Sequence, residues 1–143
     1  MVTYTDSLAG ITSAHLNGGF FEGWPQYPNP EAHLVVLQAV SAVLLAQDEQ
    51  GQVIGFITAL SDGVLCAYIP LLEVLPEYRD QGVGSELVRR MIAKLSPIYM
   101  IDLLCDAHLQ PYYERLGMSR ASGMYVRNYA SQAGLMTERT EET

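Results

Sequence analysis

The chain has 143 residues, of which 49% are hydrophobic and 17% are charged. This composition fits one globular domain with a real core and leaves little room for a second. The formal net charge is -8, whereas a nucleic-acid-binding protein is expected to carry a basic stripe. The longest apolar run, residues 34–46, is too short to cross a bilayer, and the start lacks the features of a secretion signal. We expect a cytoplasmic protein that binds neither nucleic acid nor membrane.

The charge is divided unevenly along the chain. All eight basic residues follow position 78, whereas eight of the sixteen acids precede that point and eight follow it, so the two parts carry net charges of -8 and zero. One interpretation is that the acids keep the first part soluble. The other is that one part meets an anionic ligand and the other a cationic one.

The first 41 residues predict a short strand at 2–5 and helices at 8–16 and 31–37. The loop between the helices contains three prolines, which exclude regular structure there. It also holds Glu22, Trp24 and further aromatic residues, Phe20, Phe21 and Tyr27. Glu22 and Trp24 are candidates for binding an acceptor amine on an apolar body. Alternatively, the rings pack the helices onto the sheet.

The middle of the chain predicts an antiparallel meander. Apolar runs at 42–46 and 53–60 flank a turn at 48–51, which is typical of a β-hairpin. A second turn at 61–63 leads into an apolar strand at 65–75. The two cysteines, Cys66 and Cys105, are far apart and lack metal-ligand spacing, so we expect buried free thiols and no metal site.

Residues 83–95 then predict a helix, because apolar residues recur every three to five positions and Ser96-Pro97 ends the pattern. The apolar run 98–105 predicts a strand buried between layers. Gly82 and Gly84 lie at the amino end of the helix, where free backbone N–H groups and the helix dipole favour a phosphate.

Two phosphate-binding motifs fit this turn poorly. A P-loop requires Gly-Lys-Ser/Thr, but Gly84 is followed by Ser85 and no lysine precedes position 94. A dinucleotide fingerprint requires a third glycine where Leu87 stands, and an antiparallel meander is the wrong context for it. A dinucleotide-binding domain, or a turn that only connects a strand to a helix, remains as an alternative.

A third motif fits. The stretch "VLPEYRDQGVGSELVRRM" resembles the acetyl-CoA signature of the GNAT acetyltransferase superfamily, Arg/Gln-x-x-Gly-x-Gly/Ala, through Arg79, Gly82 and Gly84, with the usual Val-x-Pro at Val74 and Pro76. The stretch "DAHLQPYYERLGM", residues 106–118, is similar to the segment that follows the fifth strand in that family. Because both signatures occur in the right order, the chain is identified as a member.

The resemblance implies an α/β (α+β) GNAT fold. Its sheet is mixed but mostly antiparallel and splayed between the fourth and fifth strands, with helices on both faces. We expect this domain to span residues 1–129 and a disordered polar tail to span 130–143. The implied activity is the transfer of an acetyl group from acetyl-CoA to a primary amine by direct attack in a ternary complex.

The resemblance also implies the cofactor site. Backbone groups of residues 72–74 would bind pantetheine and the acetyl carbonyl, and backbone amides of residues 80–85 would cradle the pyrophosphate. Asp106 stands where the family commonly has Asn, whose amide hydrogen bond a carboxylate cannot donate. The predicted cofactor-binding residues are Leu72, Val74, Arg79, Asp80, Gln81, Gly82, Val83, Gly84, Ser85 and Asp106.

Two residues are candidates for catalysis. Tyr113 matches the family's tyrosine and is the candidate acid for the leaving thiolate, the alternative being a core tyrosine. Glu73 is the one acid in an apolar strand, where desolvation favours a base, the alternative being a solvent-facing residue. His15, His33 and His108 are weaker candidates.

One rival function is a GNAT-like module that senses acyl-CoA without turnover. The sequence names neither the acceptor amine nor its class, which could be a metabolite or a protein amino group. It also leaves open whether the chain is a monomer or a homodimer.

Overall fold

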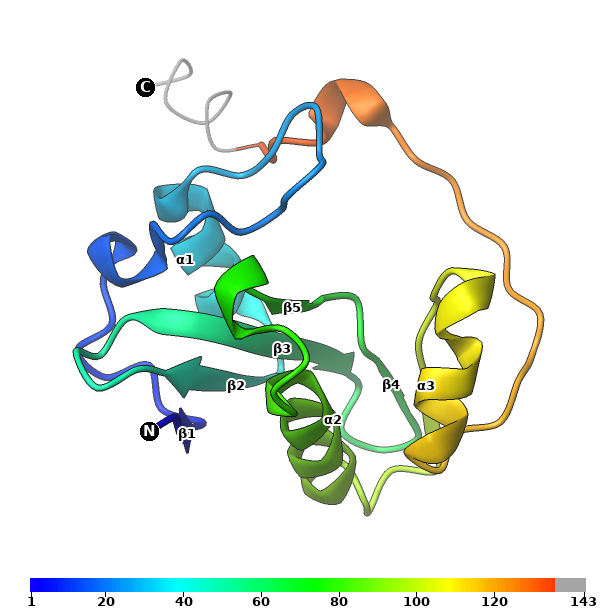
Figure 1. Cartoon of the computed structure of the whole chain (residues 1–143). Helices are drawn as coiled ribbons and strands as arrows, with labels where there is room; N and C mark the ends of the chain where they lie inside the picture. The colour runs from blue at the N-terminus through cyan, green and yellow to red at the C-terminus, as the bar shows by residue number, and fades with distance from the viewer. Residues whose placement is uncertain (136–143) are drawn as a thin grey trace.

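A computed structural model describes residues 1–135. Its sheet has six strands: β1 (Thr3–Thr5), β2 (Ala42–Gln47), β3 (Val53–Ser61), β4 (Cys66–Tyr68), β5 (Leu72–Val74) and β6 (Met100–Asp102). The order is β1-β2-β3-β4-β6, with β5 paired to β3 beside β4 (Figure 1). All pairs are antiparallel except β4 with β6. The predicted mixed and mostly antiparallel sheet is confirmed.

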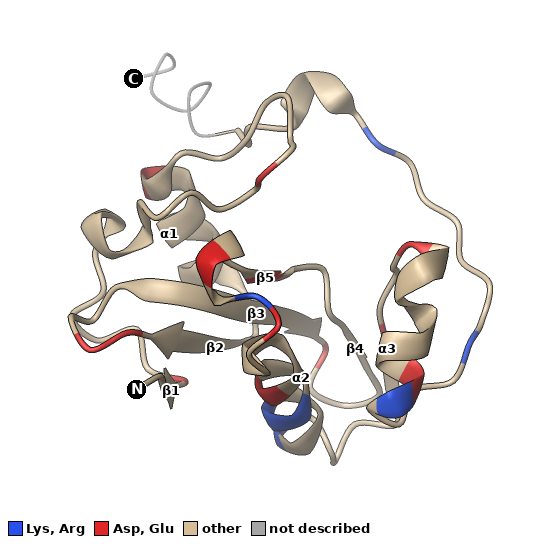
Figure 2. Ribbon diagram, in the orientation of Figure 1, with Lys and Arg blue, Asp and Glu red and all other residues tan. Residues whose placement is uncertain are grey.

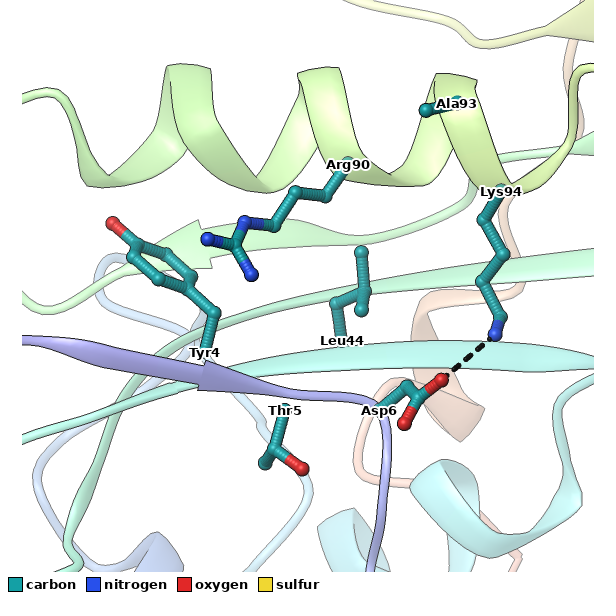
Figure 3. Close-up of a pocket in the computed structure, with 7 residues that line it drawn as sticks. All are labelled: Tyr4, Thr5, Asp6, Leu44, Arg90, Ala93 and Lys94. Carbon is teal, nitrogen blue, oxygen red and sulfur yellow. Dashed lines mark hydrogen bonds and ion pairs between the residues drawn. The ribbon is translucent and has the colours of Figure 1, made fainter.

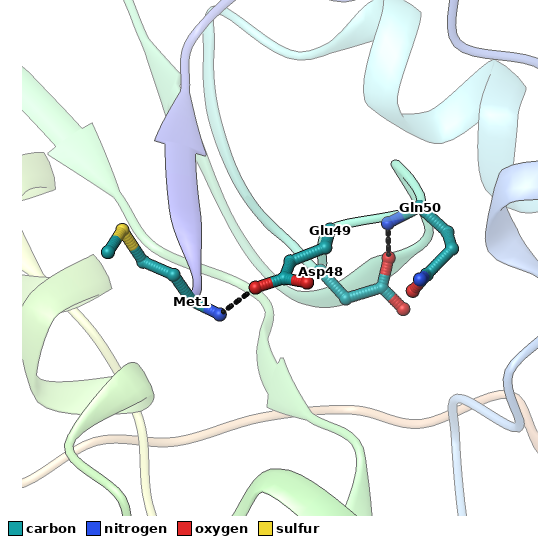
Figure 4. A network of polar contacts seen from close by, with 4 residues as sticks. All are labelled: Met1, Asp48, Glu49 and Gln50. Atoms are coloured by element: carbon teal, nitrogen blue, oxygen red, sulfur yellow. Dashed lines mark hydrogen bonds and ion pairs between the residues drawn. The ribbon is translucent and has the colours of Figure 1, made fainter.

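The hairpin of β2 and β3 closes on the turn that the sequence predicted. The Asp48 carboxylate accepts a hydrogen bond from the backbone N–H of Gln50 at 2.9 Å (Figure 4), and a second one from the backbone N–H of Gln52 at 3.0 Å. Gly51 has φ +83°, a conformation that glycine adopts without strain. The amino group of Met1 pairs with Glu49 at 2.9 Å, but both groups are exposed, so this pair contributes little stability.

Helices cover both faces of the sheet, as expected. They are α1 (Pro30–Ala39) and α2 (Val83–Lys94). In β3, Phe56 packs against His33 of α1, with ring centroids 4.4 Å apart, whereas a Cβ on the preceding Gly55 would contact Val83 and Leu87 of α2. Successive residues of a strand point to opposite faces. The two helices therefore lie on opposite sides of β3 (Figure 1).

An aromatic cluster joins the N-terminal loop to the sheet. Phe20 and Phe21 are 7% and 3% exposed, and both pack on Phe56 and on the His33 ring. These two rings therefore hold α1 and the loop onto the core. Tyr27, by contrast, is 57% exposed.

The predicted strand 65–75 is two strands, β4 and β5. Residues 69–71, which include Pro70, interrupt the regular pairing with β3, although the Leu71 carbonyl still accepts a hydrogen bond from the Thr58 N–H at 3.0 Å. Beyond this break β4 continues the sheet to β6, while β5 pairs with β3 alone among the described strands. The sheet is therefore splayed between β5 and β6, which correspond to the expected fourth and fifth strands.

Three other predictions were wrong. The expected helix 8–16 is only the short 3-10 helix η1 (Ser13–Leu16), because Gly10 has φ +77° and interrupts it. The expected buried strand 98–105 is the three-residue β6, which lies at the end of the sheet and is partly exposed. The expected buried thiols are an exposed Cys66 and a half-buried Cys105, both free.

The remaining elements are the 3-10 helices η2 (Pro76–Tyr78), η3 (Ala107–Leu109) and η4 (Tyr129–Ser131), and the helix α3 (Gln110–Arg115). Of the predicted tail, residues 130–135 are described and begin within η4, while 136–143 lie outside the described residues. No helix in the described part of the chain has the length and apolarity needed to cross a membrane.

Candidate active site

The outer edge of β5 offers backbone groups without a strand partner. Leu75 N–H donates to Ile54, and the Leu71 carbonyl accepts from Thr58, so alternate residues of this strand face β3. The backbone groups of Leu72 and Val74 therefore face the splayed side. The backbone of Glu73 faces β3 through its pairing with Phe56, so it does not join the other two at the open edge as expected.

The amino end of α2 lies beside this edge. Gly82 is the N-cap residue with φ +83°, and no side chain caps the helix. The first hydrogen bond of the helix runs from Glu86 N–H to the Gly82 carbonyl, which leaves the N–H groups of residues 83–85 without a partner inside the helix. Asp80 has φ +61°, uncommon for a residue with a side chain. The turn thus presents backbone donors and the positive end of the helix dipole.

Tyr112 reaches this turn from α3. Its hydroxyl oxygen accepts a hydrogen bond from Ser85 Oγ at 3.1 Å, which leaves the phenol proton free to donate elsewhere. A Cβ on Gly84 would lie 3.2 Å from the same oxygen and 3.6 Å from a methyl group of Val74. The Tyr112 hydroxyl therefore lies between the open edge of β5 and the glycine turn. Tyr112 was not among the site residues predicted from the sequence.

Tyr113 lies next to Tyr112, with ring centroids 5.0 Å apart. It is half-buried and packs against the core. Burial, with a smaller effect of Tyr112, raises its pKa to about 12. The phenol therefore stays protonated at neutral pH, which an acid requires. The structure records no hydrogen bond of this hydroxyl among the described residues, so its predicted role as an acid is untested.

Glu73 points to the face of the sheet opposite α2. Its Oε1 accepts a hydrogen bond from the backbone N–H of Phe21 at 2.7 Å. Desolvation raises its pKa, while this hydrogen bond and the nearby Arg79 act in the opposite direction. It is half-buried, not a freely solvated strand residue.

Arg79 connects the N-terminal loop to the glycine turn. Its Nε donates to the Val74 carbonyl at 3.1 Å, and its Nη1 pairs with the Glu22 carboxylate at 2.9 Å. The predicted acceptor residue Glu22 is therefore close to the predicted cofactor-binding Arg79, in a pair that is about half exposed. Trp24 lies further along the same loop, half-buried and 4.9 Å from the Phe21 ring.

Three charged residues lie apart from this arrangement, and one of them is the predicted cofactor-binding residue Asp106. Asp106 begins η3, is exposed, and makes no recorded hydrogen bond to the glycine turn within residues 1–135. Arg90 and Lys94 lie in the second half of α2, beside β1. Lys94 pairs with Asp6 at 3.0 Å, and Arg90 lies 4.5 Å above the Tyr4 ring (Figure 3). These cations line a separate hollow and supply no charge to the turn at the other end of the helix.

Comparison with known proteins identifies the family. The profile of the acetyltransferase (GNAT) family matches residues 12–118. The chain belongs to this family. The match begins at residue 12, well before the first of the two sequence signatures, which begins at Val74.

Individual relatives agree. The chain is 50% identical to a candidate acetyltransferase from Deinococcus radiodurans whose crystal structure superposes with a TM-score of 0.90, covering 93% of this chain and 92% of that one. It is 38% identical over 69 residues to the chloroplastic GCN5-related N-acetyltransferase 3 of Arabidopsis thaliana. That match covers 47% of this chain and only 29% of the longer relative.

A more distant solved structure also shares the fold. The structure of AAC(6')-Iy in complex with a bisubstrate analogue, CoA-S-monomethyl-acetylneamine, superposes with a TM-score of 0.63 at 18% identity, covering 90% of this chain and 98% of that one. At this identity the likeness supports the fold alone.

Proposed function

We propose that the protein transfers the acetyl group of acetyl-CoA to a primary amine by direct attack in a ternary complex. The observation that carries this proposal is the open edge of β5 beside the uncapped amino end of α2. An open strand edge can hydrogen-bond an extended amide chain such as pantetheine. Unpaired N–H groups at a helix amino end suit a pyrophosphate. The AAC(6')-Iy complex supports a CoA-derived ligand for this fold.

In this proposal the role of each residue follows from its position in the site. The backbone groups of Leu72 and Val74 hold the pantetheine arm, and those of residues 80–85 hold the phosphates. Glu73 takes the proton of the incoming ammonium, because its raised pKa brings it nearer to neutrality. Tyr113, protonated at neutral pH, donates to the departing thiolate. Acetyl-CoA supplies the activated thioester, whose carbonyl carbon the neutral amine attacks.

The acceptor is an amine that reaches Glu73 past the loop around Glu22 and Trp24. Of the acids in the first part of the chain, Glu22 and Glu73 both lie close enough to influence one site, since the Glu22 charge raises the Glu73 pKa. Two carboxylates against one arginine favour a cationic acceptor. The half-buried Trp24 ring supports an acceptor with an apolar body.

The experiment is a thiol-release assay with acetyl-CoA and a panel of primary amines, run beside calorimetric titrations of CoA and NAD. CoA binding and amine-dependent release of free thiol, with formation of the acetylated amine, is the expected result. CoA binding without release for any amine would favour the sensor module. Tight NAD binding without CoA binding would favour a dinucleotide-binding domain.

A further inference from the structure

Residues 119–127, which we call the linker strand, run between α3 and η4 as an extended and exposed segment (Figure 1). Within the described chain they make no backbone–backbone hydrogen bond. Three consecutive large side chains, Met124, Tyr125 and Val126, are 97%, 66% and 83% exposed. Single exposed apolar side chains are ordinary. A contiguous run that includes Tyr and Val on an unpaired backbone instead has the character of a β-strand without a sheet.

The same chain offers an unpaired sheet edge. β6 ends the sheet and pairs with β4 on one side only among the described strands. Around it, Tyr99, Met100 and Leu104 are 84%, 41% and 43% exposed. Edges of this kind are commonly protected by lysine or proline, and residues 98–106 contain neither. The edge is therefore a template for another strand.

The linker strand lies near this edge without pairing to it. Gly123 approaches the Leu104 side chain so closely that a Cβ on Gly123 would clash with it. At its start, Arg120 pairs with Glu114 of α3 at 2.7 Å. Just beyond its end, the Gln132 side chain accepts a hydrogen bond from the Gln26 backbone N–H at 3.3 Å. Both ends are thus held by other parts of the same chain while the backbone between them has no partner.

We propose that the linker strand pairs as a β-strand with the β6 edge of a second copy of this chain. Charge supports this occupant: the linker strand contains Arg120 and Arg127 and no acid (Figure 2), whereas residues 98–106 contain Asp102 and Asp106 and no base. Complementary charges favour association and fix register. Because each copy provides one linker strand and one edge, a two-fold axis forms two equivalent contacts and closes the assembly as a dimer.

The first test measures mass by light scattering coupled to size-exclusion chromatography, at tens of micromolar chain. The wild type is expected at twice its 15.8 kDa. Tyr125→Asp combined with Val126→Asp places two charges in the contact and is expected to give a folded monomer, with the far-UV circular dichroism of the wild type and a Tm lowered only by the loss of association. Tyr27→Asp, at another exposed tyrosine, is the matched control and stays dimeric. A monomeric wild type, or a dimer that persists in the double variant, would overturn the proposal.

The second test distinguishes pairing between copies from pairing within one chain. Two differently tagged chains, both with Cys66→Ser and Cys105→Ser, are co-expressed, one with Leu104→Cys and the other with Met124→Cys. Mild oxidation is expected to yield a disulfide-linked heterodimer that carries both tags. Its absence overturns the proposal, and internal closure of a single chain carrying both cysteines would then assign the linker strand to its own β6 edge.

Discussion

The carboxylate of Glu73 accepts a hydrogen bond from the backbone N–H of Phe21, 52 residues earlier in the chain, at 2.7 Å. Phe21 has φ +65°, a conformation that costs free energy in a residue with a side chain. Strained residues of this kind persist where the surrounding structure fixes them, and here the buried Phe21 ring does so. The loop and the strand thus hold one carboxylate in a fixed position on the face of the sheet opposite α2.

Glu73→Gln tests whether this carboxylate is the base. The Gln oxygen can still accept the Phe21 N–H, so the loop is retained while the proton acceptor is lost. We expect kcat to fall by about a hundredfold, with CoA affinity unchanged. In the wild type the acid limb of kcat/KM should inflect above the ordinary pKa of a glutamate, since desolvation raises it.

Glu77→Gln is the matched control, because Glu77 is an exposed acid on the neighbouring η2 and should be silent. Equal activity of the two variants with a cationic amine would remove Glu73 from the mechanism.

Tyr113→Phe and Tyr112→Phe separate two adjacent hydroxyls. If Tyr113 protonates the thiolate, its variant should lose about two orders of magnitude in kcat at unchanged CoA affinity. Tyr112→Phe removes the acceptor of the Ser85 hydrogen bond and a donor beside the cofactor turn, so a weaker CoA affinity is expected. Steady-state kinetics and calorimetry on both variants measure the difference. A large loss of kcat in Tyr112→Phe alone would assign the acid to Tyr112.

Gly84→Asp tests the phosphate site. An acid in the first turn of a helix is favourable to the helix dipole, so the variant should fold, yet it places a negative charge where the phosphates approach. We expect CoA affinity to fall by about tenfold or more. Gly84→Asn has nearly the same shape without the charge, so the difference between the two variants isolates electrostatics from the crowding at Tyr112. Calorimetry showing equal CoA affinity for Gly84→Asp and wild type would refute the assignment.

Glu22→Gln tests the acceptor preference. Without this carboxylate, kcat/KM for a cationic amine should fall several-fold, whereas kcat/KM for a neutral isostere should not change. The dependence of kcat/KM on salt concentration for the cationic amine should also weaken. Loss of the half-exposed pair with Arg79 should cost less than about 1 kcal/mol of stability. Glu31→Gln, at an exposed acid in the first turn of α1, is the control. If the ratio of kcat/KM for cationic and neutral amines is the same in Glu22→Gln and wild type, the Glu22 carboxylate does not contact the acceptor.

The sequence predicted the parts of the fold that follow from local patterns. The hairpin turn at Asp48, the helix from Val83 and the glycine turn at its start depend on residues close in sequence, and all three were found. The helix at 8–16 failed because Gly10 adopts a positive φ that its apolar neighbours do not indicate. The strand 98–105 failed because apolar composition does not reveal whether a strand lies inside a sheet or at its end.

The candidate site shows the same division. The glycine turn could be predicted because a short sequence motif contains it. The side-chain contacts of the site could not be predicted, because they join residues far apart in the chain. The pair of Glu22 with Arg79 and the hydrogen bond of Ser85 to Tyr112 depend on how the loop and α3 fold over β5. The burial of His33 was likewise missed, because nothing nearby in sequence distinguishes it from a surface histidine.

His33 leads to a prediction about stability and pH. Its side chain is 1% exposed, three phenylalanine rings surround it, and its Nε2 has no hydrogen-bond partner within residues 1–135. Burial lowers its pKa to about 4 from the usual 6.5. Between these two values the unfolded chain binds more protons than the folded one, so the stability that neutral His33 provides is complete above the unfolded pKa and is lost as pH falls towards the folded one. From about pH 8 to about pH 5 this loss is about 2 kcal/mol.

His33→Phe keeps an aromatic ring packed in the cluster and removes the group that binds a proton. The variant should therefore lose less unfolding free energy than the wild type between about pH 8 and about pH 5. Urea unfolding of wild type and variant at both pH values gives the difference, in which the other titrating groups cancel. His108→Phe, at an exposed histidine, should keep the wild-type slope. Identical slopes for wild type and His33→Phe would mean that the buried ring reaches water when protonated, and that the aromatic cluster opens at a lower cost than its packing suggests.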